Sequence, residues 1–123
     1  MHPKTILLVE DDQDTADLLI YLFTSDGFKA VHVVDGRFAF DYLTRHVVDV
    51  VLTDIMMPRM DGFQLIEAIR DKLRLTALPI LVHSALSKDI ARATGKRFDA
   101  FVQKPSRGSD VLAHVRRIMS RPS

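Results

Sequence analysis

Five short, largely apolar runs, separated by segments of helical periodicity, constrain the fold of this 123-residue chain more than any other feature. Each run is too short for a typical helix and ends at polar or turn-forming residues, which is typical of a buried strand. The runs expected to form strands are 6–9, 29–34, 47–53, 80–84 and 98–103. Because a helical segment follows each run, the pattern predicts strands joined by helical connections.

The intervening segments carry apolar residues at steps of three and four, the period of an amphipathic helix. Acidic residues before the first helix suit its dipole, and Gly27 is expected to end it. Ser87 is expected to cap a short fourth helix over 87–94, and Ser109 to cap the last helix. The apolar positions that define the other four helices are Leu18, Leu19, Leu22 and Phe23; Phe38, Ala39, Tyr42 and Leu43; Phe63, Ile66, Ile69 and Leu73; and Val111, Leu112, Val115, Ile118 and Met119.

Five strands alternating with five helices predict a parallel sheet covered on both faces, because parallel strands need crossover connections and these are right-handed. We expect a flavodoxin-like, doubly wound α/β fold with strand order 2-1-3-4-5, an order that rests on fold-level analogy rather than on periodicity. A chain of this length can bury about two thirds of its unfolded surface in one domain. We therefore expect one domain over 1–123, with its core over about 4–120 and no output domain within this chain.

Composition excludes several classes of protein. There is no cysteine, so disulfides and thiolate metal sites are excluded. The apolar runs are too short to cross a bilayer and the first residues do not begin a signal peptide, so we expect a soluble cytoplasmic protein without membrane contact. Residues 1–54 hold four basic and ten acidic side chains, and residues 84–123 hold nine basic and three acidic ones. We interpret the basic tail as a solvated helix face rather than a nucleic-acid site, because no aromatic platform or basic run accompanies it.

Polar residues mark the ends of four of the predicted strands. Glu10 and Asp11 follow the first strand, Asp54 follows the third, Ser84 ends the fourth and Lys104 follows the fifth. Because the carboxyl ends of parallel strands meet in one crevice, we expect these side chains to converge. Unit charges about 4 Å apart interact by about 4 kcal/mol at an effective dielectric near 20, so three carboxylates there require a cation. Oxygen ligands without cysteine or a histidine pair predict Mg²⁺ rather than zinc.

This set of residues is sufficient for phosphoryl transfer. Lys104 and Ser84, with Mg²⁺, can hold the oxygens of a transferring phosphoryl group, which leaves Asp54 as the nucleophile. This mechanism requires an exposed Asp54 carboxylate and a Lys104 amine directed toward it. The alternative, purely structural interpretation is that Asp54 is a turn or capping residue and that the acidic residues after the first strand only cap the first helix. The capping role is compatible with metal binding. The five histidines are scattered without ligand spacing and receive no role.

The chain resembles the receiver domain of bacterial two-component response regulators over essentially its full length. The matching elements are the apolar strand ending LLVEDD, the segment DIMMPRMDG over 54–62, the pair Ser84-Ala85 and the pair Lys104-Pro105. Each element is weak alone, but in this order and spacing they are highly specific.

The resemblance implies a phosphoacceptor and a metal site. Asp54 would accept a phosphoryl group from a sensor histidine kinase or a histidine phosphotransfer protein. Asp11, Asp54 and the backbone carbonyl of Met56 would ligate Mg²⁺ directly, and Glu10 would act through a water. Asp12 fits less well than Asp11, because the interval from Asp11 to Asp54 matches the family pattern better.

The resemblance also implies a switch. Lys104 would contact the phosphoryl group and precede a cis bond to Pro105, which a proline permits. Ser84 would hydrogen-bond a phosphoryl oxygen, and Phe101 would rotate inward when Ser84 moves. The face formed by helix four, strand five and helix five would then control a downstream protein. A homodimer that forms on phosphorylation is one possible result of the same switch. Such a protein catalyses its own phosphorylation and dephosphorylation but is not a turnover enzyme.

Three residues beside the phosphoryl group would tune its lifetime. Met56 and Leu86 are apolar and should position an attacking water poorly, while Ala85 leaves the site open to a partner or a small acyl phosphate. We therefore expect a long-lived phosphoryl group. Helix four should be short or reoriented, since the interval before Lys104 is shorter than is common in the family, and Ser106 replaces a frequent bulky apolar residue and should loosen its loop.

Two other functions stay open. One is a phosphate-independent pseudo-receiver that acts as a binding module with the same fold. The other, less favoured, is an aspartate-nucleophile phosphatase of the haloacid-dehalogenase type. Those enzymes carry a D-x-D-x-T pattern after the first strand, and the segment 12–15 does not match its last spacing.

Overall fold

The computed structural model describes residues 3–93, 95 and 97–120, and over these residues the chain forms a sheet of five parallel strands in the order β2-β1-β3-β4-β5. The strands are β1 over Thr5–Val9, β2 over Lys29–Val33, β3 over Val50–Thr53, β4 over Ile80–Ser84 and β5 over Ala100–Gln103. In the central pair, Ile6 lies opposite Val50 and Val9 opposite Thr53, so the two strands end level at their carboxyl ends. The predicted fold class and strand order are confirmed.

Two strands begin later than predicted. β3 begins at Val50 rather than at Val47, whose side chain is 93% exposed. Just before β3, Asp49 makes two hydrogen bonds to Thr5: its amide donates to the Thr5 carbonyl at 2.9 Å, and its carboxylate accepts from the Thr5 amide at 2.7 Å. β5 likewise begins at Ala100 rather than two residues earlier. An apolar residue next to a strand therefore extends the sequence pattern without extending the ladder.

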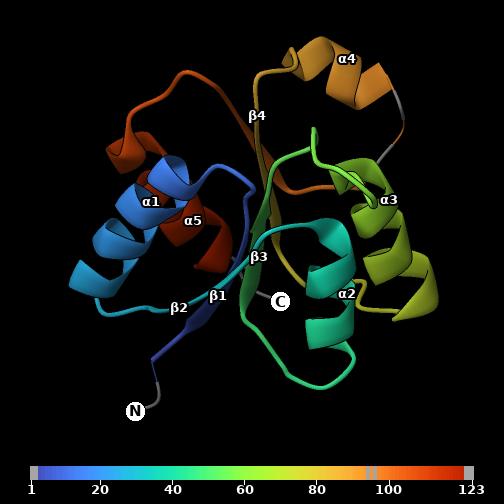
Figure 1. The fold of residues 1–123 in the computed structure, drawn as a ribbon, viewed down its shortest axis with the longest axis horizontal. Helices are drawn as coiled ribbons and strands as arrows, with labels where there is room; N and C mark the ends of the chain where they lie inside the picture. Colours follow the sequence, from blue (N-terminus) through green and yellow to red (C-terminus); the bar gives the residue numbers. More distant parts are fainter. Residues whose placement is uncertain (1–2, 94, 96, 121–123) are drawn as a thin grey trace.

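Helices cover both faces of the sheet, with α1 and α5 on one face and α2, α3 and α4 on the other (Figure 1). The helices are α1 over Gln13–Ser25, α2 over Gly36–Leu43, α3 over Gly62–Glu67 with a π-helical continuation over Ala68–Lys72, α4 over Lys88–Ala93 and α5 over Gly108–Met119. The short α4 agrees with the prediction, whose last residue, Thr94, lies outside the described residues. None of these helices is both long enough and apolar enough to span a bilayer.

One of the two predicted serine caps is wrong. The Ser87 hydroxyl accepts a hydrogen bond from the Ile90 amide at 3.3 Å and caps α4 as expected. Ser109 does not cap α5, because the helix begins one residue earlier, with Arg107 in the cap position and no side-chain cap within the described residues. A Cβ atom at residue 108 would meet the Cδ1 atom of Leu22 in α1 at 2.2 Å, so a larger residue there would require the Leu22 side chain to shift.

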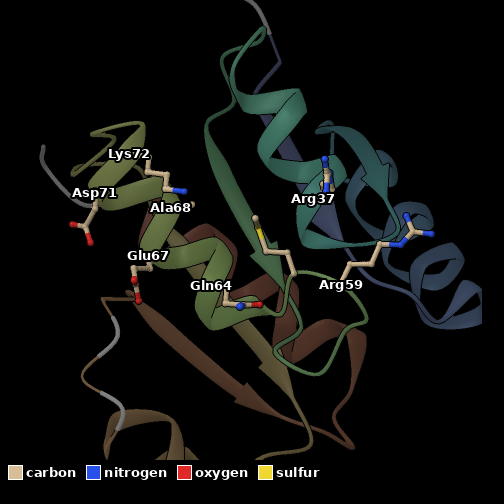
Figure 2. Close-up of a pocket in the computed structure, with 8 residues that line it drawn as sticks. Arg37, Arg59, Gln64, Glu67, Ala68, Asp71 and Lys72 are labelled. Atoms are coloured by element: carbon tan, nitrogen blue, oxygen red, sulfur yellow. The ribbon is translucent and has the colours of Figure 1, made fainter.

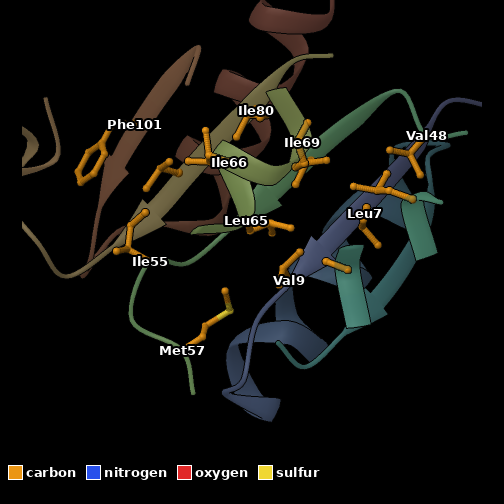
Figure 3. Close-up of a cluster of buried hydrophobic side chains, with 14 of the residues drawn as sticks. Leu7, Val9, Val48, Ile55, Met57, Leu65, Ile66, Ile69, Ile80 and Phe101 are labelled. Atoms are coloured by element: carbon orange, nitrogen blue, oxygen red, sulfur yellow. The ribbon is translucent and has the colours of Figure 1, made fainter. Parts of the chain in front are cut away.

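The central strands β1 and β3 bury both of their faces and are apolar except at one end residue each, Thr5 and Thr53. In β1, Leu7 and Val9 face the cluster beneath α2, α3 and α4, and Ile6 and Leu8 face the cluster beneath α1 and α5. Figure 3 shows the first cluster, in which strand side chains meet those of α3. Leu18 was one of the four apolar positions that defined the predicted first helix, but its side chain is more than half exposed on α1.

Candidate functional site

Three carboxylates meet at the carboxyl ends of β1 and β3. Glu10 and Asp11 directly follow β1, and Asp54 directly follows β3. One oxygen from each lies within 4.8 Å of the others. The Asp54 amide donates to the Val9 carbonyl at 3.1 Å, which continues the pairing of the two strands by one residue. The backbone ladder thereby fixes Asp54 beside the acidic residues of β1.

The two oxygens of Asp54 have different partners. Oδ1 accepts hydrogen bonds from the amides of Ile55 at 2.6 Å and Met56 at 3.1 Å, while Oδ2 lies 2.8 Å from the Lys104 amine. The expectation that this carboxylate lies open is wrong, because Asp54 is only 7% exposed. The Lys104 side chain covers it and is itself partly exposed. Access to Oδ2 therefore requires the amine to move, whereas Oδ1 is held by the backbone.

The Lys104 amine joins two of the carboxylates. Besides Asp54, it donates to Glu10 Oε1 at 2.9 Å, so the side chain is directed as the sequence predicted. Burial alone would lower the pKa of Lys104, but the hydrogen bonds to Asp54 and Glu10 outweigh burial and raise it. The amine is therefore charged at neutral pH. The bond between Lys104 and Pro105 is cis, as the resemblance implied.

Glu10 is the most deeply buried of the three carboxylates, with 2% of its surface exposed. Its Oε2 accepts a hydrogen bond from the Asp12 amide at 3.1 Å, and its backbone carbonyl lies 2.8 Å from His32 Nε2. Burial raises the pKa of Glu10, and the hydrogen bond from Lys104 only partly offsets this effect. The position of His32 could not be predicted, because one histidine on an edge strand carries no distinguishing signal.

The structure separates the roles of Asp11 and Asp12. Asp12 caps α1, and its carboxylate accepts hydrogen bonds from the Thr15 hydroxyl and amide, which lower the pKa of Asp12. Asp11 is exposed and contributes an oxygen to the carboxylate cluster. This arrangement agrees with the preference for Asp11 over Asp12 as a metal ligand.

Ser84 lies at the same edge but is fully buried. Its hydroxyl oxygen accepts a hydrogen bond from the Leu86 amide at 3.3 Å, and its carbonyl accepts from the Lys104 amide at 2.8 Å. Among the described residues, no hydrogen bond joins this hydroxyl to Asp54. The Phe101 side chain is also buried, with its ring centroid 6.0 Å from that of Phe98. Phe101 thus belongs to the hydrophobic core, whereas Ser84 is buried at the carboxyl end of β4.

The residues expected to tune the phosphoryl lifetime lie around the crevice. Met56 is well exposed beside Asp54, Ala85 is exposed, and Leu86 is half-buried. The Met56 amide is tied to Asp54 Oδ1, which fixes the backbone of the residue whose carbonyl was expected to bind metal.

The donor set fits a hard divalent cation. All three converging groups are carboxylates, and among the residues that the structure describes Lys104 supplies the one ammonium that contacts them. Two negative charges therefore remain uncompensated, and carboxylate oxygens are the ligands that Mg²⁺ prefers in proteins. Glu10 also keeps a raised pKa, so a nearby cation would favour its charged form.

Sequence reasoning missed the residues that pin the loop after Asp54. Asp35 is buried, caps α2 through the Phe38 amide at 3.0 Å, and pairs with Arg59 at 3.4 Å. Arg59 adopts a left-handed backbone with φ of 67°, which is uncommon outside glycine. Its pairing with Asp35 therefore holds the loop to α2.

A hollow of about 550 Å³ lies between α2 and α3 (Figure 2). Arg37 and Arg59 line one side, and Gln64, Glu67 and Lys72 belong to the α3 side. None of the three clustered carboxylates lines it. The clustered carboxylates therefore lie at the strand ends, outside the hollow between α2 and α3.

Comparison with known proteins identifies many relatives. The family model "Response regulator receiver domain" matches residues 6–116. Response regulator GtcR of Aneurinibacillus migulanus is 31% identical over 120 residues, which cover 96% of this chain and 48% of that protein. Response regulator Rre1 of Synechocystis sp. is 32% identical over 98% of this chain and 53% of that protein. This chain thus spans about half the length of these curated relatives.

Solved structures share the fold. The signal receiver domain of a signal transduction histidine kinase from Syntrophus aciditrophicus is 29% identical, with a TM-score of 0.87, and the match covers 98% of this chain and 95% of that chain. The receiver domain of the sensor histidine kinase PA1611 from Pseudomonas aeruginosa PAO1, solved with a magnesium ion in its active site cleft, is 24% identical, also with a TM-score of 0.87. That match covers 98% of this chain and 100% of the other.

Proposed function

This chain belongs to the response regulator receiver domain family, and we propose on that premise that Asp54 is the residue that accepts the phosphoryl group. Receiver domains of this family are the phosphoacceptor signalling domains of two-component systems, and this chain is one of them. The observation that supports Asp54 is the position of the Lys104 amine, 2.8 Å from Asp54 Oδ2 and 2.9 Å from Glu10 Oε1. An ammonium at this position can stabilise the negative charge of the carboxylate before transfer and that of the phosphoryl oxygens during it.

In the proposed transfer, Oδ2 of Asp54 attacks the phosphorus of a phosphohistidine. A P–O bond to Asp54 forms as the P–N bond breaks, and the electron pair leaves with the donor imidazole. Oδ2 is the attacking oxygen because Oδ1 is fixed by two backbone amides. Lys104 moves from Oδ2 to a phosphoryl oxygen, and the buried Ser84 hydroxyl turns to donate to another, which makes Ser84 the start of the switch and Phe101 its partner in the core.

Mg²⁺ is the proposed cofactor of this transfer. Glu10, Asp11 and Asp54, with the Met56 carbonyl, would hold it, by analogy with the magnesium ion in the cleft of the PA1611 receiver domain. Bound there, Mg²⁺ would neutralise charge on the phosphoryl oxygens. Its presence would also offset the repulsion among the three carboxylates.

The partners follow from the family. We propose a sensor histidine kinase or a histidine phosphotransfer protein as the donor, and a downstream protein that recognises the face formed by α4, β5 and α5. A homodimer that forms on phosphorylation is one form this recognition can take. Proteins of this family act once per phosphoryl group, and the self-catalysed gain and loss of that group at Asp54 is part of the proposal.

Mass spectrometry after incubation with acetyl phosphate and Mg²⁺ tests the assignment. The parent protein should gain the mass of one phosphoryl group, Asp54→Asn should gain none, and Lys104→Met should gain it much more slowly. A folded parent without any gain would favour a phosphate-independent binding module. A gain that persists in Asp54→Asn would refute Asp54 as the acceptor.

A further inference from the structure

A buried histidine next to Ser84 makes a hydrogen bond that the transfer mechanism does not use. His83 is only 6% exposed, and its Nε2 lies 2.9 Å from the Ser106 hydroxyl oxygen. Its other ring nitrogen, Nδ1, is buried and has no hydrogen-bond partner among the described residues. A buried polar atom without a hydrogen-bond partner costs stability, so the presence of this ring calls for an explanation.

The ring is neutral at physiological pH. Burial, with a smaller effect of Lys104, lowers the pKa of His83 to about 4. A neutral imidazole has one N–H, and we place it on Nε2, where it donates to Ser106, because a buried N–H left unpaired at Nδ1 would cost more than a bare nitrogen. The hydrogen bond between these two residues is therefore present throughout the neutral range.

This hydrogen bond joins the two strand ends that carry the switch residue and the lysine. His83 precedes Ser84 on β4, and Ser106 lies two residues beyond Lys104. The two strands pair in register, with His83 opposite Val102. Ser106 itself is exposed, so this bond is an anchor reaching into the protein from an otherwise open loop.

Among the described residues, the hydrogen bond to His83 is the one side-chain hydrogen bond made by the segment 105–107. α5 then begins without a side-chain cap in the described part of the chain. Two features that sequence analysis treated separately, an unassigned histidine and a serine in place of a bulky apolar residue, thus meet in one interaction.

We propose that His83 and Ser106 are a positioning pair for phosphoryl transfer, which holds the Lys104 side of the crevice in register with the Ser84 side. Neither residue contacts the reacting atoms. Their hydrogen bond restricts the motion of the segment that contains Lys104. The Lys104 amine is therefore already oriented toward the crevice before the transfer begins. This inference rests on the proposed function, because it assumes that Asp54 is phosphorylated.

The test measures the phosphorylation of Asp54 by acetyl phosphate at saturating Mg²⁺. Ser106→Ala and His83→Leu should each lower the maximal rate about fivefold, the effect of one hydrogen bond on a barrier, while the half-saturating acetyl phosphate and Mg²⁺ concentrations change less than about twofold. The double variant should be no slower than His83→Leu alone, since both changes remove the same bond.

Conservative variants distinguish positioning from packing. His83→Gln and Ser106→Thr keep a donor and a hydroxyl at similar reach and should restore most of the rate. The matched control is Ser109→Ala, which removes an exposed hydroxyl without a hydrogen bond among the described residues three positions along, and it should match the parent.

Three results would overturn the inference. They are a parent rate in Ser106→Ala, an additive loss in the double variant, or a lowered melting temperature with an unchanged rate per folded molecule. A parent that is not phosphorylated at all would instead refute the proposed function and this inference with it, so the two failures are distinguishable.

Discussion

Arg70 is the residue whose removal should destabilise this fold most clearly. It lies in the π-helical turn after α3 and is 6% exposed. Its guanidinium donates to the carbonyls of Leu75 and Leu78, both at 2.7 Å, to the carbonyl of Arg97 at 3.2 Å, and to the Asp99 carboxylate at 3.2 Å. One side chain thereby joins the end of α3, the segment before β4 and the segment before β5.

The size of the effect depends on what the acceptors do without Arg70. Hydrogen bonds from a charged donor contribute about 1.5–3 kcal/mol each, so four of them would sum to more than about 6 kcal/mol. That sum is too high, because Leu75 and Arg97 are exposed and their carbonyls can bind water instead. Asp99 also keeps its hydrogen bond from the Ile80 amide at 2.8 Å.

Burial of the Arg70 charge has a free-energy cost, which is seen in the lowered pKa of Arg70, and this cost disappears when Arg70 is replaced. We therefore expect Arg70→Met to lower the free energy of unfolding by about 2–4 kcal/mol, at or below the range for breaking a buried ion pair from one side. Arg70→Lys keeps the charge but reaches fewer acceptors, and should cost about 1–3 kcal/mol.

Urea unfolding followed by circular dichroism measures this loss. With a slope of about 1.5 kcal/mol/M, the midpoint of Arg70→Met should fall by about 1.3–2.7 M. The control is Arg45→Met, an exposed arginine without a side-chain contact among the described residues, which should shift by less than about 0.5 kcal/mol. A midpoint in Arg70→Met within about 0.3 M of the parent, at unchanged slope, would show that the carbonyls lose nothing when the guanidinium leaves.

Three further predictions concern the site. The pKa of His83 is lowered from 6.5 to about 4, so between these pH values the unfolded chain binds more protons than the folded one, and the free energy of unfolding falls as pH falls. In urea unfolding at pH 7 and pH 4, His83→Leu should abolish up to about 3 kcal/mol of this loss. A variant that loses as much stability between the two pH values as the parent would contradict the prediction. Mg²⁺ should raise the melting temperature of the parent but not of Asp11→Asn, and equal shifts would exclude Asp11 as a ligand. Met56→Asn should shorten the phosphoryl lifetime in a time course of phosphate release, and a parent no slower than this variant would remove the expectation of a long-lived state.

The sheet could be predicted because its strands obey a simple rule. A strand covered on both faces is apolar at most positions, and β3 shows this with three buried apolar residues followed by one buried polar residue, Thr53. The rule does not locate the first paired residue, which is why Val47 was placed in a strand although it is exposed. An apolar residue indicates that a position favours burial, whereas the first hydrogen-bonded residue of a strand depends on where the neighbouring strand pairs with it.

The convergence of Asp54, Glu10 and Lys104 was predictable for the same topological reason. Once the strands are parallel and their order is assumed, the residues at their carboxyl ends must share one edge. The contacts of His83 and Arg70 were not predictable, because their partners are a loop hydroxyl and backbone carbonyls. Those acceptors exist in every chain, and only the path of the loops brings them within reach.

Charge shows why the lysine cannot replace the metal in the proposed cycle. Lys104 now contacts two carboxylates, Glu10 and Asp54, and the third, Asp11, has no share in that amine. Transfer converts the Asp54 carboxylate, which carries one negative charge, into an acyl phosphate that carries about two at neutral pH, so this edge gains about one negative charge just when the amine has to follow the phosphorus. Glu10 would then lose Lys104, its one ammonium partner in the described part of the chain, while staying buried, and its already raised pKa would rise further unless a divalent cation stayed beside it. Mg²⁺ is thus required most after the transfer, and its removal should destabilise the phosphorylated state more than the free one.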